Sequence, residues 1–177
     1  TFSLWRALSM NQVVTDAINK QINAELNSSY AYLAMSGFCE LKNFCGSANW
    51  LRVQSQEEYG HAMKLFDFLL ARNVKVQLKA MERPADSFGS IVEVFEQALA
   101  QEQEVSGQID ALYELAFNEK AFAALVELQW FLSEQVEEEK TAREIVAKFH
   151  MVRDDPASLL DLDRELGVRV GDGSTPA

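Results

Sequence analysis

The chain has 177 residues and a mass of 19.9 kDa, a length that suits one domain. Its 48% hydrophobic and 24% charged residues, with only 8 Gly and 3 Pro, exclude a disordered or collagen-like chain and a turn-rich β-sandwich. The net charge of −11 repels nucleic acid and anionic membranes, so we expect neither as a partner and favour a cationic one.

Four long segments of the chain have apolar residues at three- and four-residue steps, the period of an α-helix. These segments are about 9–39, 46–73, 88–116 and 119–149. A turn at 41–47 predicts that the first two form a helical hairpin. The segment 74–89 predicts a long crossover, with Asp86 or Ser87 as the cap of the third helix. Asn118 is the expected cap of the fourth.

The end of the chain predicts a fifth, shorter helix. Asp155 is a typical cap and is followed by proline, which is favoured at the first helical position, so we expect a helix at about 156–166 and a flexible tail at 167–177. The fold class is therefore all-α: a four-helix bundle at about 9–149 with a long connection between the second and third helices. We expect residues 1–177 to form a single domain.

Each long helix has one carboxylate near the middle of the face that its apolar pattern predicts to be buried. These residues are Glu25, Glu58, Glu102 and Glu138, and His61 follows Glu58 on the same face. Unpaired buried ions are costly, by several kcal/mol each. Two divalent cations would balance the four negative charges, and oxygen ligands with one imidazole favour iron or manganese. The pattern predicts a site for two metal ions.

A second acidic set consists of Glu57, Glu134 and Glu137. Each residue lies one position before a residue of the buried face, which turns it about 100° around the helix. The set is compatible with a third, weaker cation site and equally with an ordinary solvated acidic face. The sequence leaves both readings open.

The two cysteines, Cys39 and Cys45, are too few for a disulfide framework or a four-cysteine metal site. They favour reduced thiols and a cytoplasmic protein. No stretch approaches the ~20 apolar residues of a membrane span, so a membrane location is not expected.

Several segments between residues 11 and 166 resemble the non-haem bacterial ferritins. They are QINAEL at 21–26 through Tyr32, QEEYGHA at 56–62, QEQ at 101–103, LQWFLSEQ at 128–135 and EEE at 137–139. The resemblance implies a ferritin-like four-helix bundle that assembles into a cage of 24 identical subunits. It further implies oxidation of Fe²⁺ by O₂ or peroxide at a di-iron ferroxidase centre within each subunit, and storage of the ferric mineral inside the cage.

The resemblance also implies a role for each candidate residue. One iron would be held by Glu25, Glu58 and His61. The other would be held by Glu58, Glu102 and Glu138, so that Glu58 bridges the two. Gln135 and Tyr32 would lie beside this centre. A third iron would be held by Glu57, Glu134 and Glu137.

The sequence departs from related patterns at two positions. The residue three after Glu138 is Thr141, so the second iron lacks the imidazole that bacterioferritins supply there. Bacterioferritins bind haem through a methionine directly after the second-helix glutamate, where this chain has Tyr59, so haem is not expected. The alternatives are a di-iron peroxidase or oxygenase and a metal-free acidic helical assembly protein.

Overall fold

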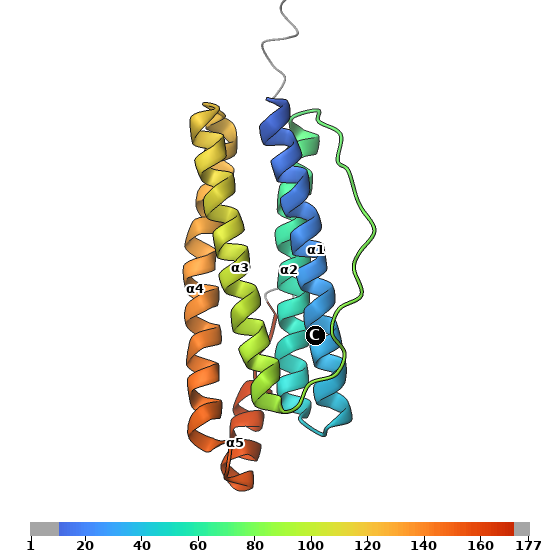
Figure 1. Ribbon diagram of the computed structural model, residues 1–177, viewed down its shortest axis with the longest axis vertical. Coiled ribbons are helices and arrows are strands. Elements are labelled where there is room, and N and C mark those ends of the chain that lie inside the picture. Colours follow the sequence, from blue (N-terminus) through green and yellow to red (C-terminus); the bar gives the residue numbers. More distant parts are fainter. Residues whose placement is uncertain (1–10, 172–177) are drawn as a thin grey trace, which may run out of the picture.

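The computed structural model describes residues 11–171, and within that range it has five α-helices and no strand (Figure 1). Their bounds are α1 Gln12–Leu41, α2 Cys45–Ala71, α3 Ile91–Asn118, α4 Phe122–Val152 and α5 Pro156–Leu166. α1 pairs with α2 and α3 with α4, and α5 lies at one end of the bundle (Figure 1). The predicted all-α bundle with a long second connection and a short fifth helix is confirmed. In this part of the chain no helix is long and apolar enough to cross a membrane.

Side chains at the helix starts explain two of the boundaries. Asp155 accepts a hydrogen bond from a main-chain N–H of α5 at 3.1 Å, as predicted. The expected cap of α3 at Asp86 or Ser87 is wrong, because Ser90 accepts from a main-chain N–H of α3 at 3.1 Å. Asn118 is the last residue of α3 rather than the cap of α4. Residues 9 and 10, expected in the first helix, lie outside the described residues.

The crossover, residues 74–90, runs along the outside of α1 (Figure 1). Three asparagines spaced four residues apart on α1 hold it: Asn19, Asn23 and Asn27. The side-chain oxygens of the first two accept the main-chain N–H groups of Gln77 and Lys79, both at 2.7 Å. The crossover has no sheet or helix to supply partners for its backbone, so this asparagine ladder supplies them.

Apolar side chains fill the bundle in two clusters rather than one continuous core. One cluster, which includes Ile18 and Leu128, lies toward the start of α1. The other, which includes Leu51 and Phe149, lies toward α5. Each fully buried side chain of this size stabilises the fold by about 1.5–3 kcal/mol. Between the two clusters the buried side chains are largely polar, including Glu25 and Glu58.

One carboxylate attaches α5 to the start of α2. Asp163 accepts the main-chain N–H of Gly46 at 3.0 Å and both the N–H and the hydroxyl of Ser47 at 2.7 Å. Phe44, at the cap position of α2, makes no side-chain cap hydrogen bond. Asp163 therefore caps α2 from a position more than 100 residues later in the chain.

The chain continues past α5 and folds back over α2. Asn49 Nδ2 donates to the main-chain oxygens of Gly167 and Arg169, at 3.3 and 3.0 Å. Residues 167–171, expected to begin a flexible tail, are thus attached to the bundle. Residues 172–177, the rest of that expected tail, lie outside the described part of the chain.

Candidate metal centre

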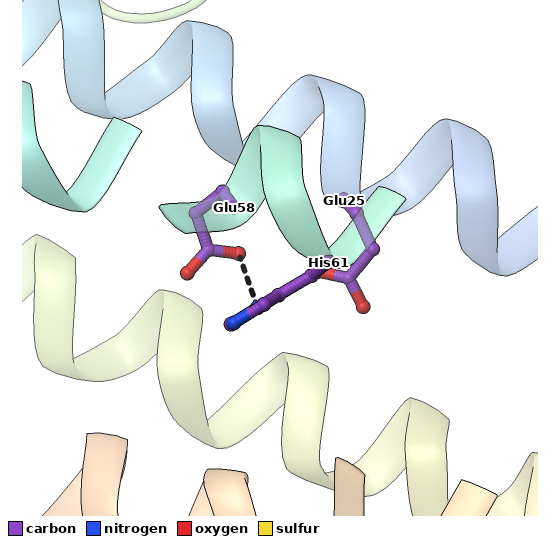
Figure 2. A group of neighbouring side chains, drawn as sticks. All are labelled: Glu25, Glu58 and His61. Carbon is purple, nitrogen blue, oxygen red and sulfur yellow. Dashed lines mark ion pairs between the residues drawn. The ribbon is translucent and has the colours of Figure 1, made fainter. Parts of the chain in front are cut away.

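Three of the predicted ligands meet between α1 and α2. Glu25 comes from α1 and Glu58 and His61 from α2, and their side chains point toward one another (Figure 2). Each offers one ligand atom, and these three atoms lie within 4.8 Å of one another. His61 Nδ1 lies 3.9 Å from Glu58 Oε2. All three side chains are buried, as the helical period predicts.

Glu102 on α3 and Glu138 on α4 are also buried, and a glutamine links the second of them to α2. Gln54 Nε2 donates to Glu58 Oε1 at 3.2 Å and to Glu138 Oε2 at 2.9 Å. Gln54 is completely buried. A single amide nitrogen therefore donates hydrogen bonds to carboxylates from two helices, α2 and α4.

Tyr32 and Gln135 both donate to Glu102. The Tyr32 hydroxyl donates to Glu102 Oε1, and Gln135 Nε2 donates to Glu102 Oε2 at 3.3 Å. These contacts fix the carboxylate that α3 contributes, and they place both residues beside the cluster.

One carboxylate oxygen of Glu25 lacks a hydrogen-bond partner among the residues 11–171. Gln21 Nε2 donates to Glu25 Oε1 at 2.8 Å. Glu25 Oε2 is buried and has no hydrogen-bond partner among the residues 11–171. A buried carboxylate oxygen without a partner is costly, and a cation coordinated there would satisfy it. The donor set of carboxylates and one imidazole suits divalent iron.

Electrostatics oppose the ionisation of all four buried carboxyl groups at once. Burial raises the pKa of Glu25 to about 7 and that of Glu138 to about 8. Burial, with the nearby charge of Glu102, also raises the pKa of Glu58. Burial and the charge of Lys64 lower the pKa of His61 to about 4. The imidazole is therefore neutral at pH 7, with a lone pair available to a metal, while the buried carboxyl groups hold their protons more tightly than ordinary glutamates and ionise more readily when cations bind.

The outer acidic set lines a pocket between α2 and α4 of about 580 Å³. Glu134 lies nearest to the buried cluster, since its carboxylate, that of Glu138 and the His61 ring offer atoms within 4.8 Å of one another. Glu57 instead pairs with Arg169, and Glu137 is exposed at the rim of the pocket. The three predicted residues of a third site thus share one pocket but differ in their surroundings.

Comparison with known proteins places this chain in a family. A model of the ferritin-like domain matches residues 15–152. The chain belongs to the ferritin family. The resemblance to the non-haem bacterial ferritins is therefore confirmed, and the chain is an iron-storage protein.

Relatives match this ferritin over nearly its full length. The bacterial non-heme ferritin of Staphylococcus saprophyticus is 36% identical over 165 residues, covering 93% of this chain and 99% of that protein. That of Staphylococcus aureus is 34% identical over 163 residues, covering 92% and 98%.

Solved ferritin structures share the fold. An open pore ferritin from the hyperthermophilic archaeon Archaeoglobus fulgidus has a TM-score of 0.90 and 42% identity, covering 92% of this chain and 99% of that chain. A humanized archaeal ferritin has a TM-score of 0.91 and 40% identity, covering 95% and 100%.

One residue beside the cluster has no role in the sequence-based interpretation. Gln54 lies on the same predicted buried face as Glu58, four residues earlier. An amide in a predicted core, one helical turn from a predicted ligand, is the signal that could have assigned it. A second missed residue is Arg169, whose Nη1 donates to Gln54 Oε1. It belongs to the segment expected to be a flexible tail, where the sequence gives no such signal.

Glu25→Gln should stabilise the metal-free ferritin at pH 8. Because the pKa of Glu25 rises from 4.5 to about 7 on folding, stability is lost as the pH rises from about 4.5 through 7. That cost is on the order of 3 kcal/mol at pH 8, at about 1.4 kcal/mol per pKa unit. Thermal unfolding of metal-free protein should show a higher Tm for the variant at pH 8 and an equal Tm near pH 4.5.

Glu114→Gln on the exposed side of α3 is the matched control and should leave Tm nearly unchanged at both pH values. A Glu25→Gln variant that is less stable than wild type at pH 8 would show that a protein group already compensates the carboxylate.

Proposed function

We propose that this ferritin oxidises Fe²⁺ at the buried cluster and stores the ferric product as a mineral inside a cage of identical subunits. The observation that supports it most is the meeting of carboxylates from four helices, with one imidazole, in the polar interior between two apolar clusters. Glu25 Oε2, buried and without a hydrogen-bond partner within residues 11–171, favours a cation as the missing partner.

In this proposal the ligands divide into two sets that share Glu58. One Fe²⁺ is held by Glu25, Glu58 and His61. The other is held by Glu58, Glu102 and Glu138. Sharing one carboxylate keeps the two ions close enough to react with the same oxidant molecule. Tyr32 and Gln135 hold Glu102 in place through their hydrogen bonds.

The charges favour release of the product. Four carboxylates balance two Fe²⁺ ions. Two electrons leave the pair and, with two protons, reduce O₂ to hydrogen peroxide or peroxide to two water molecules. The two Fe³⁺ ions then carry two more positive charges than the four carboxylates balance, so oxide or hydroxide must join them. Hydrolysed ferric ions are on the way to a mineral, which suits storage.

We assign the outer acidic set to a weaker third cation site. Glu134 favours it most, because its carboxylate lies near Glu138 and His61. Iron held there would pass between the buried cluster and the pocket that opens beside it. The solvated-face reading remains the alternative for Glu137, which is exposed.

Assembly and location complete the proposal. Twenty-four copies would enclose the cavity that a mineral requires, as the resemblance to the non-haem ferritins implies. Both cysteines are free thiols, which favours the cytoplasm.

The test combines iron oxidation with particle mass. Metal-free protein receives increasing Fe²⁺ without oxygen and is then mixed with oxygenated buffer, while absorbance and oxygen uptake are followed. A fast phase that saturates at two Fe²⁺ per subunit, on a particle of 24 chains of 19.9 kDa, supports the proposal. A fast phase that depends on an organic co-substrate would favour a peroxidase or oxygenase. No fast phase and no bound iron would favour a metal-free assembly protein.

A further inference from the structure

Arg169 reaches the metal centre from the segment that follows α5. Its Nη1 donates to Gln54 Oε1 at 2.8 Å, and its Nη2 donates to a carboxylate oxygen of Glu57. The guanidinium carbon lies 4.4 Å from the ring centroid of Trp50. Three groups of α2 therefore fix this one side chain, and Asn49 fixes its main-chain oxygen.

The contact with Gln54 decides how that amide is turned. A glutamine amide has an oxygen that only accepts and a nitrogen that only donates. Arg169 only donates, and Glu58 and Glu138 only accept in the ionised form that binds a cation. A single orientation satisfies all three partners, with Oε1 toward Arg169 and Nε2 toward the carboxylates, and this is the orientation observed.

The amide in turn orients the two carboxylates. Gln54 Nε2 donates a hydrogen bond to Oε1 of Glu58. The other carboxylate oxygen of Glu58, Oε2, faces His61 and lies 3.9 Å from the Nδ1 atom of that ring. Gln54 Nε2 also donates a hydrogen bond to Oε2 of Glu138. Gln54 thus fixes each of these two carboxylates through a hydrogen bond to one of its oxygens.

We propose that Arg169 is a positioning residue for the metal centre: it locks the Gln54 amide, which keeps Glu58 and Glu138 in the orientation that takes up cations. The inference rests on the proposed function, because it assigns these carboxylates as metal ligands. It adds that Arg169, which the proposal does not count among the metal ligands, determines the affinity of the ion bound by Glu138.

Positioning and charge predict opposite effects for Arg169→Ala. Removing a positive charge close to a cation site should tighten cation binding if charge alone matters. Loss of positioning should weaken it, since partners that orient metal ligands typically change affinity by 10–100-fold. We expect a loss of about tenfold for the ion that uses both Glu58 and Glu138, and a smaller loss for the ion that uses His61, because Gln54 orients only one of its ligands, Glu58.

Titration of the full-length metal-free chain with Co²⁺, followed by its visible absorption, measures both affinities without iron oxidation. Gln54→Leu should weaken binding of the same ion as Arg169→Ala does, and the double variant should bind no more weakly than either. Arg169→Lys keeps the charge but not the two-point donor, so it should lie between Ala and wild type. Arg164→Ala, which removes an exposed arginine paired with Asp161, is the control and should match wild type.

The outcomes separate the two proposals. Unchanged or tighter Co²⁺ binding by Arg169→Ala, or losses that add in the double variant, would overturn the positioning role. Gln54→Leu keeps the segment after α5 and its contacts to Glu57 and Trp50, so it tests the role even if Arg169→Ala loosens that segment. A wild-type chain that binds no Co²⁺ at the buried cluster would overturn the proposed function and this inference with it. Two bound Co²⁺ with no effect of Arg169→Ala would overturn this inference alone.

Discussion

His61→Ala should remove the fast phase of Fe²⁺ oxidation, lowering its initial rate by roughly 100-fold or more. His61 is one of two histidines in the chain and supplies the imidazole of the buried cluster. Without it, one Fe²⁺ keeps only carboxylate ligands and loses its place beside the other ion. Stopped-flow absorbance after addition of two Fe²⁺ per subunit measures the rate, and circular dichroism checks that the bundle remains helical.

His150→Ala is the matched control, because His150 lies at the surface of α4 and pairs with Glu96 at 2.8 Å. It should oxidise Fe²⁺ at the wild-type rate. Glu58→Ala should be as severe as His61→Ala, since the proposed mechanism gives Glu58 to both ions. Wild-type initial rates in either His61→Ala or Glu58→Ala would show that oxidation occurs elsewhere.

Gly46→Ala should destabilise the subunit by about 3 kcal/mol or more, or detach α5. A Cβ at Gly46 would lie 1.7 Å from the main-chain oxygen of Asp163, and neither backbone can move without breaking the cap that Asp163 forms on α2. Thermal unfolding measures the loss. Proteolysis between α4 and α5 reports whether the short helix has left its site.

Gly107→Ala provides the opposite control. Gly107 lies inside α3, and among the residues 11–171 a Cβ built there would meet no atom within 4 Å. Alanine at Gly107 should therefore stabilise α3 by about 0.5–1 kcal/mol, the usual difference in helix propensity. Equal Tm changes for Gly46→Ala and Gly107→Ala would contradict the close contact with Asp163.

The sequence predicts the helices and the buried cluster well because both depend on one local period. Glu25, Glu58, Glu102 and Glu138 each lie in step with apolar neighbours on their own helix, so their burial follows without knowing how the helices meet. The five helices are confirmed, with boundaries that differ by a few residues. The role of each carboxylate as an iron ligand stays a proposal.

The remaining features are contacts between parts of the chain that no period connects. From the sequence alone, Asp163 is one of several charged residues in a short helix, but in the fold it caps α2. From the sequence alone, Asn19 and Asn23 are ordinary polar residues of α1, but in the fold they accept hydrogen bonds from the main chain of the crossover. Arg169 lies in a segment with no pattern at all. In each case one polar side chain satisfies a distant backbone or amide group, and only the fold shows which group that is.

The cap that Asp163 places on α2 has a consequence for how the chain folds as it is made. α2 begins at Cys45, but the carboxylate that satisfies its first N–H groups is synthesised more than 100 residues later. At the usual 5–20 residues per second that interval lasts roughly 5–25 s. During that interval the nascent chain contains α1 and α2 but lacks the cap of α2. A ribosome-bound chain that stops before residue 163 should therefore fray at the start of α2.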